Sequence, residues 1–301
     1  MTSEARQSPQ NDTHAACSSI VRMRLPRFAR HDNLLLRPLC LRLIMKKIAL
    51  LLLLALPAAL RAQEFKMKFT SATNRKVVLD MRGSDVTVEG YDGDELLIRG
   101  SGHYEAPPAL ANGLRAIYSG GASDNTRLGV SVVPGDNNTI RITGLTHGDD
   151  RYTVRLPRQT DVSFEQITWG GSDDLTLRDL AGRIEVSLKS GDIRLLNVSG
   201  PVVANTISGD IKVQFSATPT QPSAVTSVSG DVDVTLPPSA KVSLSMRSIS
   251  GEIYTDFDLN LGGGNGLRHV GGQTVEGRAN GGGATFSLKT ISGDIFVRKA
   301  K

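Results

Sequence analysis

One short phrase recurs along the C-terminal half of this chain, and it restricts the possible folds more than any other feature. Ser-Gly-Asp or Ser-Gly-Glu, followed at once by an alternating apolar run, occurs in "LKSGDIRLLNV", "NTISGDIKVQF", "TSVSGDVDVTL", "RSISGEIYTDF" and "LKTISGDIFVRK". A phrase repeated in this way indicates a repeated structural unit rather than a repeated active site.

Glycines that open or precede short strands follow a regular interval in this part of the chain. The first four of the series, Gly182, Gly191, Gly200 and Gly209, are nine residues apart. The glycines of the Ser-Gly-Asp and Ser-Gly-Glu phrases then continue at Gly230 and Gly251, 21 residues apart, and at Gly293 after 42 residues, which is twice that interval. Periods near twenty that combine strands and turns are typical of solenoids, in which equivalent residues stack one rung above another.

The chemistry of the phrase fits a corner followed by a strand. Glycine can adopt a positive φ or fit a crowded bend. Serine before it and aspartate after it can hydrogen-bond to the local backbone and close the turn, and the next apolar residue begins an inward-facing ladder. The predicted corner residues are Gly191, Asp192, Gly209, Asp210, Gly230, Asp231, Gly251, Gly293 and Asp294.

Short alternating runs continue along the whole of residues 63–301, each bounded by Gly, Pro, Asn, Asp or Ser. Period-two alternation of this kind predicts strands with one buried face. The main interruption is 101–126, where two prolines and several glycines predict a long loop. A β-sandwich would also contain many short strands, but it gives no reason for the same corner chemistry at a fixed interval. We therefore predict an all-β solenoid built from short strands and Ser-Gly-Asp corners.

The N-terminal part of the chain has a different character. Residues 45–62 contain two lysines, an apolar run and small residues in the order of a secretory signal peptide, with cleavage expected after Ala62. Residues 1–44 are expected to be a non-native or disordered extension, with Met45 as the true initiator; a long basic targeting arm is the alternative. The working protein would then be a single domain, 63–301.

Removal of residues 1–62 changes the charge balance. They hold 10 of the 35 Lys and Arg and 3 of the 30 Asp and Glu, so the remainder has a net charge of about −2 and no basic footprint for nucleic acid. Both cysteines, Cys17 and Cys40, are lost with this segment, so neither disulfides nor thiol chemistry is expected. No further transmembrane segment is expected after cleavage.

The corner aspartates raise the question of calcium. Calcium-binding β-rolls also repeat every nine residues, but with more glycine per repeat, and calcium requires six to eight oxygen ligands. Asp192, Asp210, Asp231 and Asp294 could form a weak cation ladder if their corners align. We favour the simpler role, in which each aspartate closes its own turn.

Few residues in the sequence indicate catalysis. Asp173 and Asp174 are adjacent and lie near Trp169. Neighbouring strand residues point to opposite faces, whereas a glycosidase needs two carboxylates about 5–10 Å apart around one bond. The three histidines of residues 63–301 are scattered, without a second ligand at metal spacing. We expect no catalytic residue, no metal site and no cofactor.

Three stretches together resemble one known family. They are "GSDVTVEGYDGDELLIRG" at 83–100, the serial "SGDI" corners, and "GGGATFSLKTISGDIFVRK" at 281–299. These resemble DUF4097, a mostly bacterial and often exported family labelled as proposed adhesins, and the resemblance covers nearly all of 63–301. It implies a right-handed parallel β-solenoid and brings no catalytic residue with it. The sequence departs from the pattern at "GGSDD", 170–174, and at 260–283, where a Gly-rich loop replaces one expected corner.

The expected function is therefore binding. We expect an exported, non-enzymatic module, located in the periplasm, at the cell surface or outside the cell, that binds an envelope or surface ligand, either a protein or a glycan. Loops on a rigid scaffold commonly carry function, so the candidates are Tyr104 and Tyr118 in the loop 101–126, the corner at Trp169, and the loop 261–272. A polysaccharide-active enzyme and a self-associating envelope scaffold are the alternatives.

Overall fold

The computed structural model describes residues 64–81, 83–100, 108–114, 116, 118, 121–145, 150–166, 174–260 and 273–301. These residues belong to one compact unit that runs from Leu60 to Lys301. The predicted extension 1–44 and signal segment 45–62 lie outside the described residues.

The described chain is all-β, apart from a single 3-10 turn at Ala109–Ala111, and its strands form two ten-stranded sheets. Sheet A contains, in spatial order, β1 (Glu64–Lys68), β4 (Glu95–Gly100), β7 (Arg151–Pro157), β3 (Asp85–Tyr91), β9 (Leu175–Arg178), β11 (Ile193–Val198), β13 (Ile211–Phe215), β15 (Val232–Leu236), β20 (Ile295–Lys299) and β17 (Ile253–Thr255). Sheet B contains, in spatial order, β18 (Gln273–Ala279), β16 (Val242–Ser250), β19 (Ala284–Ser292), β14 (Ser223–Ser229), β12 (Val202–Ser208), β10 (Ile184–Ser190), β8 (Asp161–Glu165), β2 (Lys76–Asp80), β6 (Thr139–Gly144) and β5 (Val130–Pro134).

Both sheets are mixed. The central strands pair in parallel, as β12 does with β10 and β14. Antiparallel pairs occur only towards the ends of the sheets among the described residues, where β1 pairs with β4, β4 with β7, β5 with β6, and β18 with β16. The prediction of an all-β fold is confirmed, while the expectation of a purely parallel arrangement is corrected at both ends.

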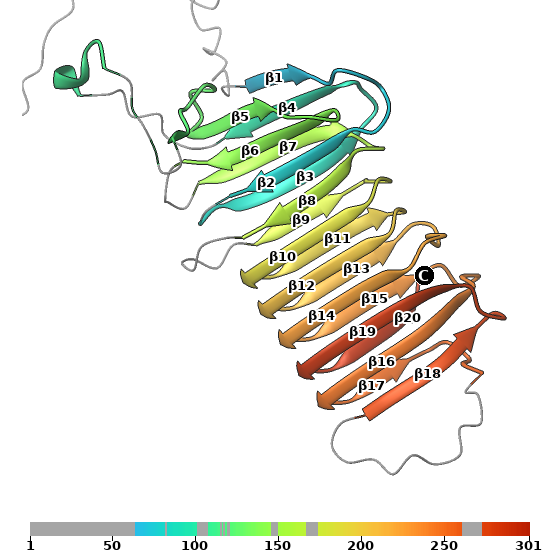
Figure 1. Ribbon diagram of the computed structural model, residues 1–301. Helices are drawn as coiled ribbons and strands as arrows, with labels where there is room; N and C mark the ends of the chain where they lie inside the picture. Colours follow the sequence, from blue (N-terminus) through green and yellow to red (C-terminus); the bar gives the residue numbers. More distant parts are fainter. Residues whose placement is uncertain are drawn as a thin grey trace, which may run out of the picture. The chain divides into compact units, whose positions relative to one another are not determined.

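The repeated phrase links the two sheets. We call a sheet B strand, its Ser-Gly-Asp or Ser-Gly-Glu corner and the following sheet A strand a rung; β10–β11, β12–β13, β14–β15, β16–β17 and β19–β20 are five rungs of this kind. Figure 1 shows their strands stacked one above another in each sheet. The regular interval in the sequence therefore corresponds to a physical repeat.

The core lies between the sheets and follows from the alternation. In β13, "IKVQF", every second side chain is buried and the residues between them are exposed. The first residue after the corner is fully buried at Ile193, Ile211, Val232 and Ile295, as predicted, whereas Ile253 on the edge strand β17 is only half-buried. Phe215 from sheet A meets Phe286 from sheet B edge to face, with ring centroids 5.4 Å apart, so the two sheets share one hydrophobic core.

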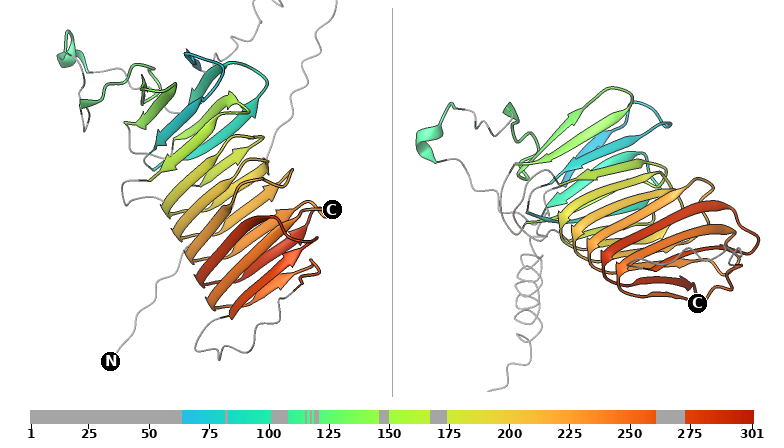
Figure 2. Two further views of the ribbon diagram at one scale, coloured as in Figure 1. Left: turned by 45° about the vertical axis from the view of Figure 1, so that its right-hand side comes forward. Right: turned by 60° about the horizontal axis from the view of Figure 1, so that its bottom comes forward.

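The spatial order of the rungs differs from the order of the sequence. The final rung, β19–β20, lies between β14–β15 and β16–β17, because β19 pairs with both β14 and β16, and β20 with both β15 and β17. Figure 2 shows these dark red strands among the orange ones. The 42-residue interval before Gly293 is therefore filled by a strand that reverses direction, β18, and by the return of the chain into the stack. The N-terminal end is arranged similarly, with β2 between β8 and β6, and β3 between β9 and β7.

Candidate binding surface

The corner carboxylates lie in one column and hydrogen-bond from rung to rung. The Oδ1 atoms of Asp192, Asp210, Asp231 and Asp294 each accept the backbone N–H of the corner residue on the next rung, at 3.0, 2.8, 2.8 and 2.8 Å. The last of these N–H groups belongs to Glu252. The expectation that each aspartate closes its own turn was wrong, because the Oδ1 atom of each aspartate accepts a backbone N–H of the neighbouring rung instead.

Hydroxyl groups complete the same corners. At the corners of Gly230, Gly251 and Gly293, the buried residue three positions before the glycine donates its hydroxyl to a glycine carbonyl on the adjacent rung. The bonds are Ser227 Oγ to Gly209 O at 3.2 Å, Thr290 Oγ1 to Gly230 O at 3.0 Å, and Ser248 Oγ to Gly293 O at 3.0 Å. Hydroxyl and carboxylate groups together therefore supply hydrogen-bond partners for the backbone where the chain turns between the sheets.

The column begins at Asp174, where an ion pair fixes its charge. Arg194 donates to Asp174 Oδ2 and to Asp192 Oδ2, both at 2.8 Å. The hydrogen bond from Arg194 holds the pKa of the Asp174 carboxyl below its usual range, and the same bond raises the pKa of Arg194. A general acid needs a raised pKa, so Asp174 has the opposite character. Asp173 lies outside the described residues.

Removal of one carboxylate from the column has a predictable cost. Asp210→Ala leaves the Asp231 N–H without its acceptor, which we expect to lower the free energy of unfolding by about 1–2 kcal/mol. Asp210→Asn keeps an oxygen that can accept the bond and should lose less than half as much. Urea unfolding of the two variants measures the difference; equal losses would show that the rung-to-rung bond contributes nothing.

Exposed aliphatic side chains form a second column on sheet B, on the outer face near the same corners. Ile207, Val228, Ile291 and Ile249 are 42%, 38%, 48% and 46% exposed. They lie side by side on β12, β14, β19 and β16, because the residues on either side of each are paired in register. We call these four residues the aliphatic stripe.

A shallow groove of about 270 Å³ follows part of the stripe. Its lining residues are Thr226, Ser227, Val228, Arg247, Ile249, Lys289, Thr290 and Ile291. Lys289 and Arg247 are direct neighbours in the β16–β19 register. Neither takes part in an ion pair with any residue that the structure describes. The surface therefore combines an apolar track with two uncompensated positive charges, which we call the cation pair.

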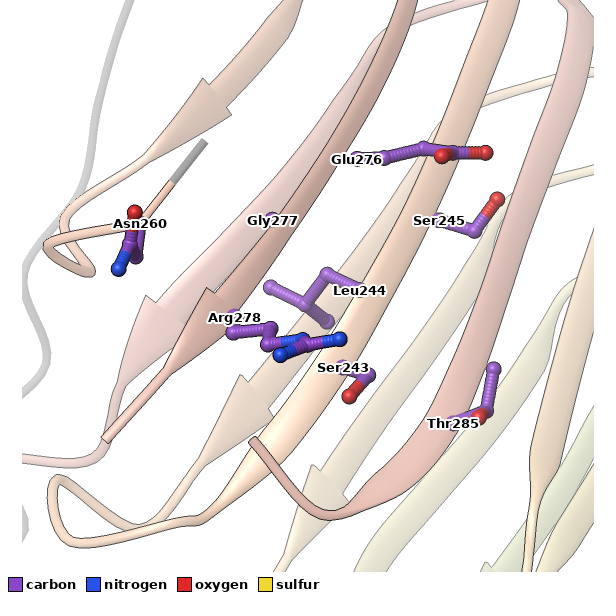
Figure 3. Close-up of a pocket in the computed structure, with 8 residues that line it drawn as sticks. All are labelled: Ser243, Leu244, Ser245, Asn260, Glu276, Gly277, Arg278 and Thr285. Carbon is purple, nitrogen blue, oxygen red and sulfur yellow. The ribbon is translucent and has the colours of Figure 1, made fainter. Parts of the chain in front are cut away.

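A larger hollow, of about 530 Å³, lies beside β16 and β18 at the end of sheet B. It is lined by Ser243, Leu244, Ser245, Asn260, Glu276, Gly277, Arg278 and Thr285, and Figure 3 shows the Arg278 side chain extending towards Ser243 and that of Glu276 towards Ser245. Ser243 Oγ donates to the Gly283 carbonyl at 3.4 Å, and Asn260 bridges to the backbone of Arg278. Several polar groups that line this hollow are therefore engaged in hydrogen bonds within the end of sheet B.

Sheet A carries an aromatic pair at the same end. Tyr254 on β17 stacks on Phe296 of β20, with centroids 5.2 Å apart and ring planes 10° apart. The Arg298 guanidinium lies 4.9 Å from the Phe296 centroid and donates to Asp233 at 3.0 Å. Its charge is therefore compensated within the fold, unlike the charges of the cation pair.

The structure places the predicted site residues in two groups. All nine corner residues are described, and they lie together in the column of corners. Tyr104, Trp169 and the loop 261–272 lie outside the described residues. Tyr118 is half-buried, and its carbonyl accepts the Gly121 N–H at 3.0 Å in a local turn. Among the described residues, no group of three His, Cys, Asp or Glu is arranged to hold a metal ion.

The stripe is the feature that the sequence-based search missed. Its signal is present, since the residue directly before Ser-Gly is Ile or Val in four of the five phrases and Lys189 in the first. Strand alternation places that residue outward once the residue before it points inward. The pattern therefore places an apolar residue on the solvent-facing side of the strand, directly before the polar corner.

Comparisons with known proteins support the resemblance to DUF4097. Residues 158–298 match the family model described as Toastrack DUF4097, a range that leaves out the similar stretch at 83–100. A search of curated proteins finds no match. Among the described residues, no helix has the length and apolar character needed to cross a membrane.

Three solved structures are similar at low identity. They are a proposed cell adhesion protein from Clostridium sporogenes ATCC 15579 (12% identity, TM-score 0.42, covering 79% of this chain and 99% of that chain), a proposed adhesin from Bacteroides fragilis NCTC 9343 (13%, 0.29, 79% and 97%), and a proposed lipid-binding protein from Parabacteroides distasonis ATCC 8503 (11%, 0.25, 79% and 96%). Similarities at this level carry no functional conclusion for this chain.

Proposed function

Residues 158–298 belong to the Toastrack DUF4097 family, and from that premise we propose that this chain is an exported, non-enzymatic interaction module that binds its ligand through the outer face of sheet B. The proposal includes its architecture, a right-handed β-solenoid with capped ends. The parallel pairing of the five rungs and the continuous corner column support that architecture. The signal-like segment 45–62 supports export.

The aliphatic stripe is the observation that carries the proposal. Eight large hydrophobic residues are exposed among those that the structure describes, and half of them belong to this one column. Scattered exposed hydrophobic residues are ordinary, whereas a contiguous apolar patch marks an interaction site. The sheet does not require isoleucine there, because Lys189 occupies the equivalent position on the rung before Ile207.

The edges of the sheets favour a binding module over a self-assembling scaffold. An exposed edge strand invites pairing with another chain, and proteins block such edges with charges, proline or short strands. Lys66 and Lys68 lie on β1, Pro134 ends β5, β17 has only three residues, and Glu276 and Arg278 are exposed on β18. All four edge strands thus carry such a feature.

The test is loss of binding without loss of folding. We expect Val228→Ser to lower retention of the purified protein on isolated bacterial envelope fractions at least fivefold, because it interrupts the apolar track. Val133→Ser is the matched control, since Val133 is 51% exposed on sheet B but lies on β5, away from the stripe.

Both variants should unfold at the temperature of the parent protein within a few degrees, because neither side chain is in the core. Equal retention of the two variants would refute the assignment of the stripe as the binding surface. Turnover of a cell-wall polysaccharide by the parent protein would instead place the chain among enzymes.

A further inference from the structure

We propose that the aliphatic stripe and the cation pair together bind a single-chain anionic amphiphile as a monomer, with its unbranched aliphatic chain along the stripe and its anionic head at Lys289 and Arg247. This inference rests on the proposed function and names the class of ligand for the same surface.

The apolar half of the site has the shape of one extended chain. The stripe crosses four neighbouring strands, and three strand spacings give it a length of about 14 Å. The groove beside it is lined by Val228, Ile291 and Ile249 together with Lys289 and Arg247, whose stems can cover apolar surface while their charges stay in water. Lys189 takes the aliphatic position on the next rung and ends the stripe.

The cation pair determines the orientation in which the ligand lies along the stripe. Like charges on directly paired strand positions repel each other, and Lys289 and Arg247 are such neighbours without an acidic partner among the described residues. Asn205 and Thr226 take the same positions on the two preceding rungs. A carboxylate or phosphate at the cation pair would relieve the repulsion through charge-assisted hydrogen bonds. Its tail would then point over Val228 towards Ile207.

Backbone pairing excludes an added peptide strand at this place. The four strands of the stripe, β12, β14, β19 and β16, each have a neighbour on both sides, so their backbone groups are engaged in the sheet. A peptide that binds by extending a sheet needs a free edge. An aliphatic chain makes no such demand, because it offers only apolar contacts to the side chains of the face.

Calorimetric titration of the 63–301 protein with dodecanoate, the uncharged dodecyl maltoside and dodecyltrimethylammonium, each below its micelle-forming concentration, tests the proposal. Dodecanoate should bind at least tenfold more tightly than the other two. Lys289→Gln combined with Arg247→Gln should remove this preference while leaving the weaker maltoside binding unchanged. Val228→Ser should weaken all three, and Val133→Ser none.

A chain-length series adds a measure of the stripe itself. Affinity should rise about threefold for each methylene from octanoate to dodecanoate and then level off, because the stripe ends at Lys189. Affinity for the cationic amphiphile equal to that for dodecanoate, or insensitivity to the Lys289 and Arg247 changes, would overturn the proposal.

A membrane surface or a second copy of this chain, if either were bound at the stripe in place of a single amphiphile, would give different results. Binding to anionic lipid vesicles that is sensitive to Val228→Ser, without binding of dodecanoate, would overturn the proposal in favour of a membrane surface. A dimer in sedimentation that Val228→Ser dissolves would overturn it in favour of a second copy of this chain. If envelope retention depends on Val228 while dodecanoate does not bind, only the ligand class fails; if Val228 affects neither, the proposed function fails as well.

Discussion

Replacing Gly209 with alanine is expected to destabilise the protein by about 3–5 kcal/mol, the cost of a strained backbone combined with an overpacked contact. Gly209 has φ = +136°, and a Cβ atom there would lie 2.2 Å from the carbonyl oxygen of Gly191 on the neighbouring rung. The obstacle is backbone and not a flexible side chain, so the rungs themselves would have to separate. The midpoint of urea unfolding, converted with the slope of the transition, measures the loss.

Gly281→Ala is the matched control. Gly281 also has a positive φ, +89°, but a Cβ atom there would meet nothing within 4 Å. Gly281→Ala should therefore lower the free energy of unfolding by about 1–2 kcal/mol, the cost of placing a Cβ atom on a residue with positive φ. If Gly209→Ala lowers the free energy of unfolding no more than Gly281→Ala does, the close contact between rungs is not the reason that the corner requires glycine.

Replacing Ile211 with aspartate should have the largest effect of all, about 4 kcal/mol or more, and should prevent cooperative folding. Ile211 is fully buried directly after a corner. Its replacement would remove core packing and place a charge between the two sheets without a partner. Circular dichroism and size-exclusion chromatography of the purified variant would show the loss, and Ile211→Val, which keeps the apolar character, should cost only about 1 kcal/mol.

Ile207→Asp tests the same substitution on the other side of that corner. Ile207 is 42% exposed, so its aspartate remains in water and should change the free energy of unfolding by less than about 1 kcal/mol. Both changes introduce the same residue within five positions of the chain. Similar unfolding midpoints for the two variants would contradict the assignment of inward and outward faces.

The local features of the fold were accessible from the sequence. Period-two alternation identified the strands, and the residue after each Ser-Gly-Asp corner is buried as predicted, for example Ile193 and Val232. A positive φ or a crowded bend was the expected reason for glycine at the corners, and Gly230 has both, with φ = +146° and a Cβ position 2.1 Å from the carbonyl oxygen of Gly209. Each of these properties depends on a few neighbouring residues, which is why pattern reasoning reaches them.

The candidate binding surface was only partly accessible. The aliphatic stripe follows from alternation once the inward residue is known, and it could have been found at Ile207 and Val228. The cation pair could not, because Lys289 and Arg247 are far apart in the sequence and become neighbours only through the β16–β19 pairing. The predicted loop residues Tyr104 and Trp169 lie outside the described residues and stay predictions.

The sequence by itself determined the strands, the corners and the inward and outward faces of each rung, because alternation and turn chemistry act over a few residues. Only the tertiary structure decided which rungs are neighbours. Every rung presents nearly the same corner to the next, so the repeat does not distinguish one stacking order from another. The reversal of the chain at β18 settles it by returning β19 between β14 and β16, which puts Gly293 between Gly230 and Gly251. The carboxylate bonds between rungs, and the surface they support, follow from that order.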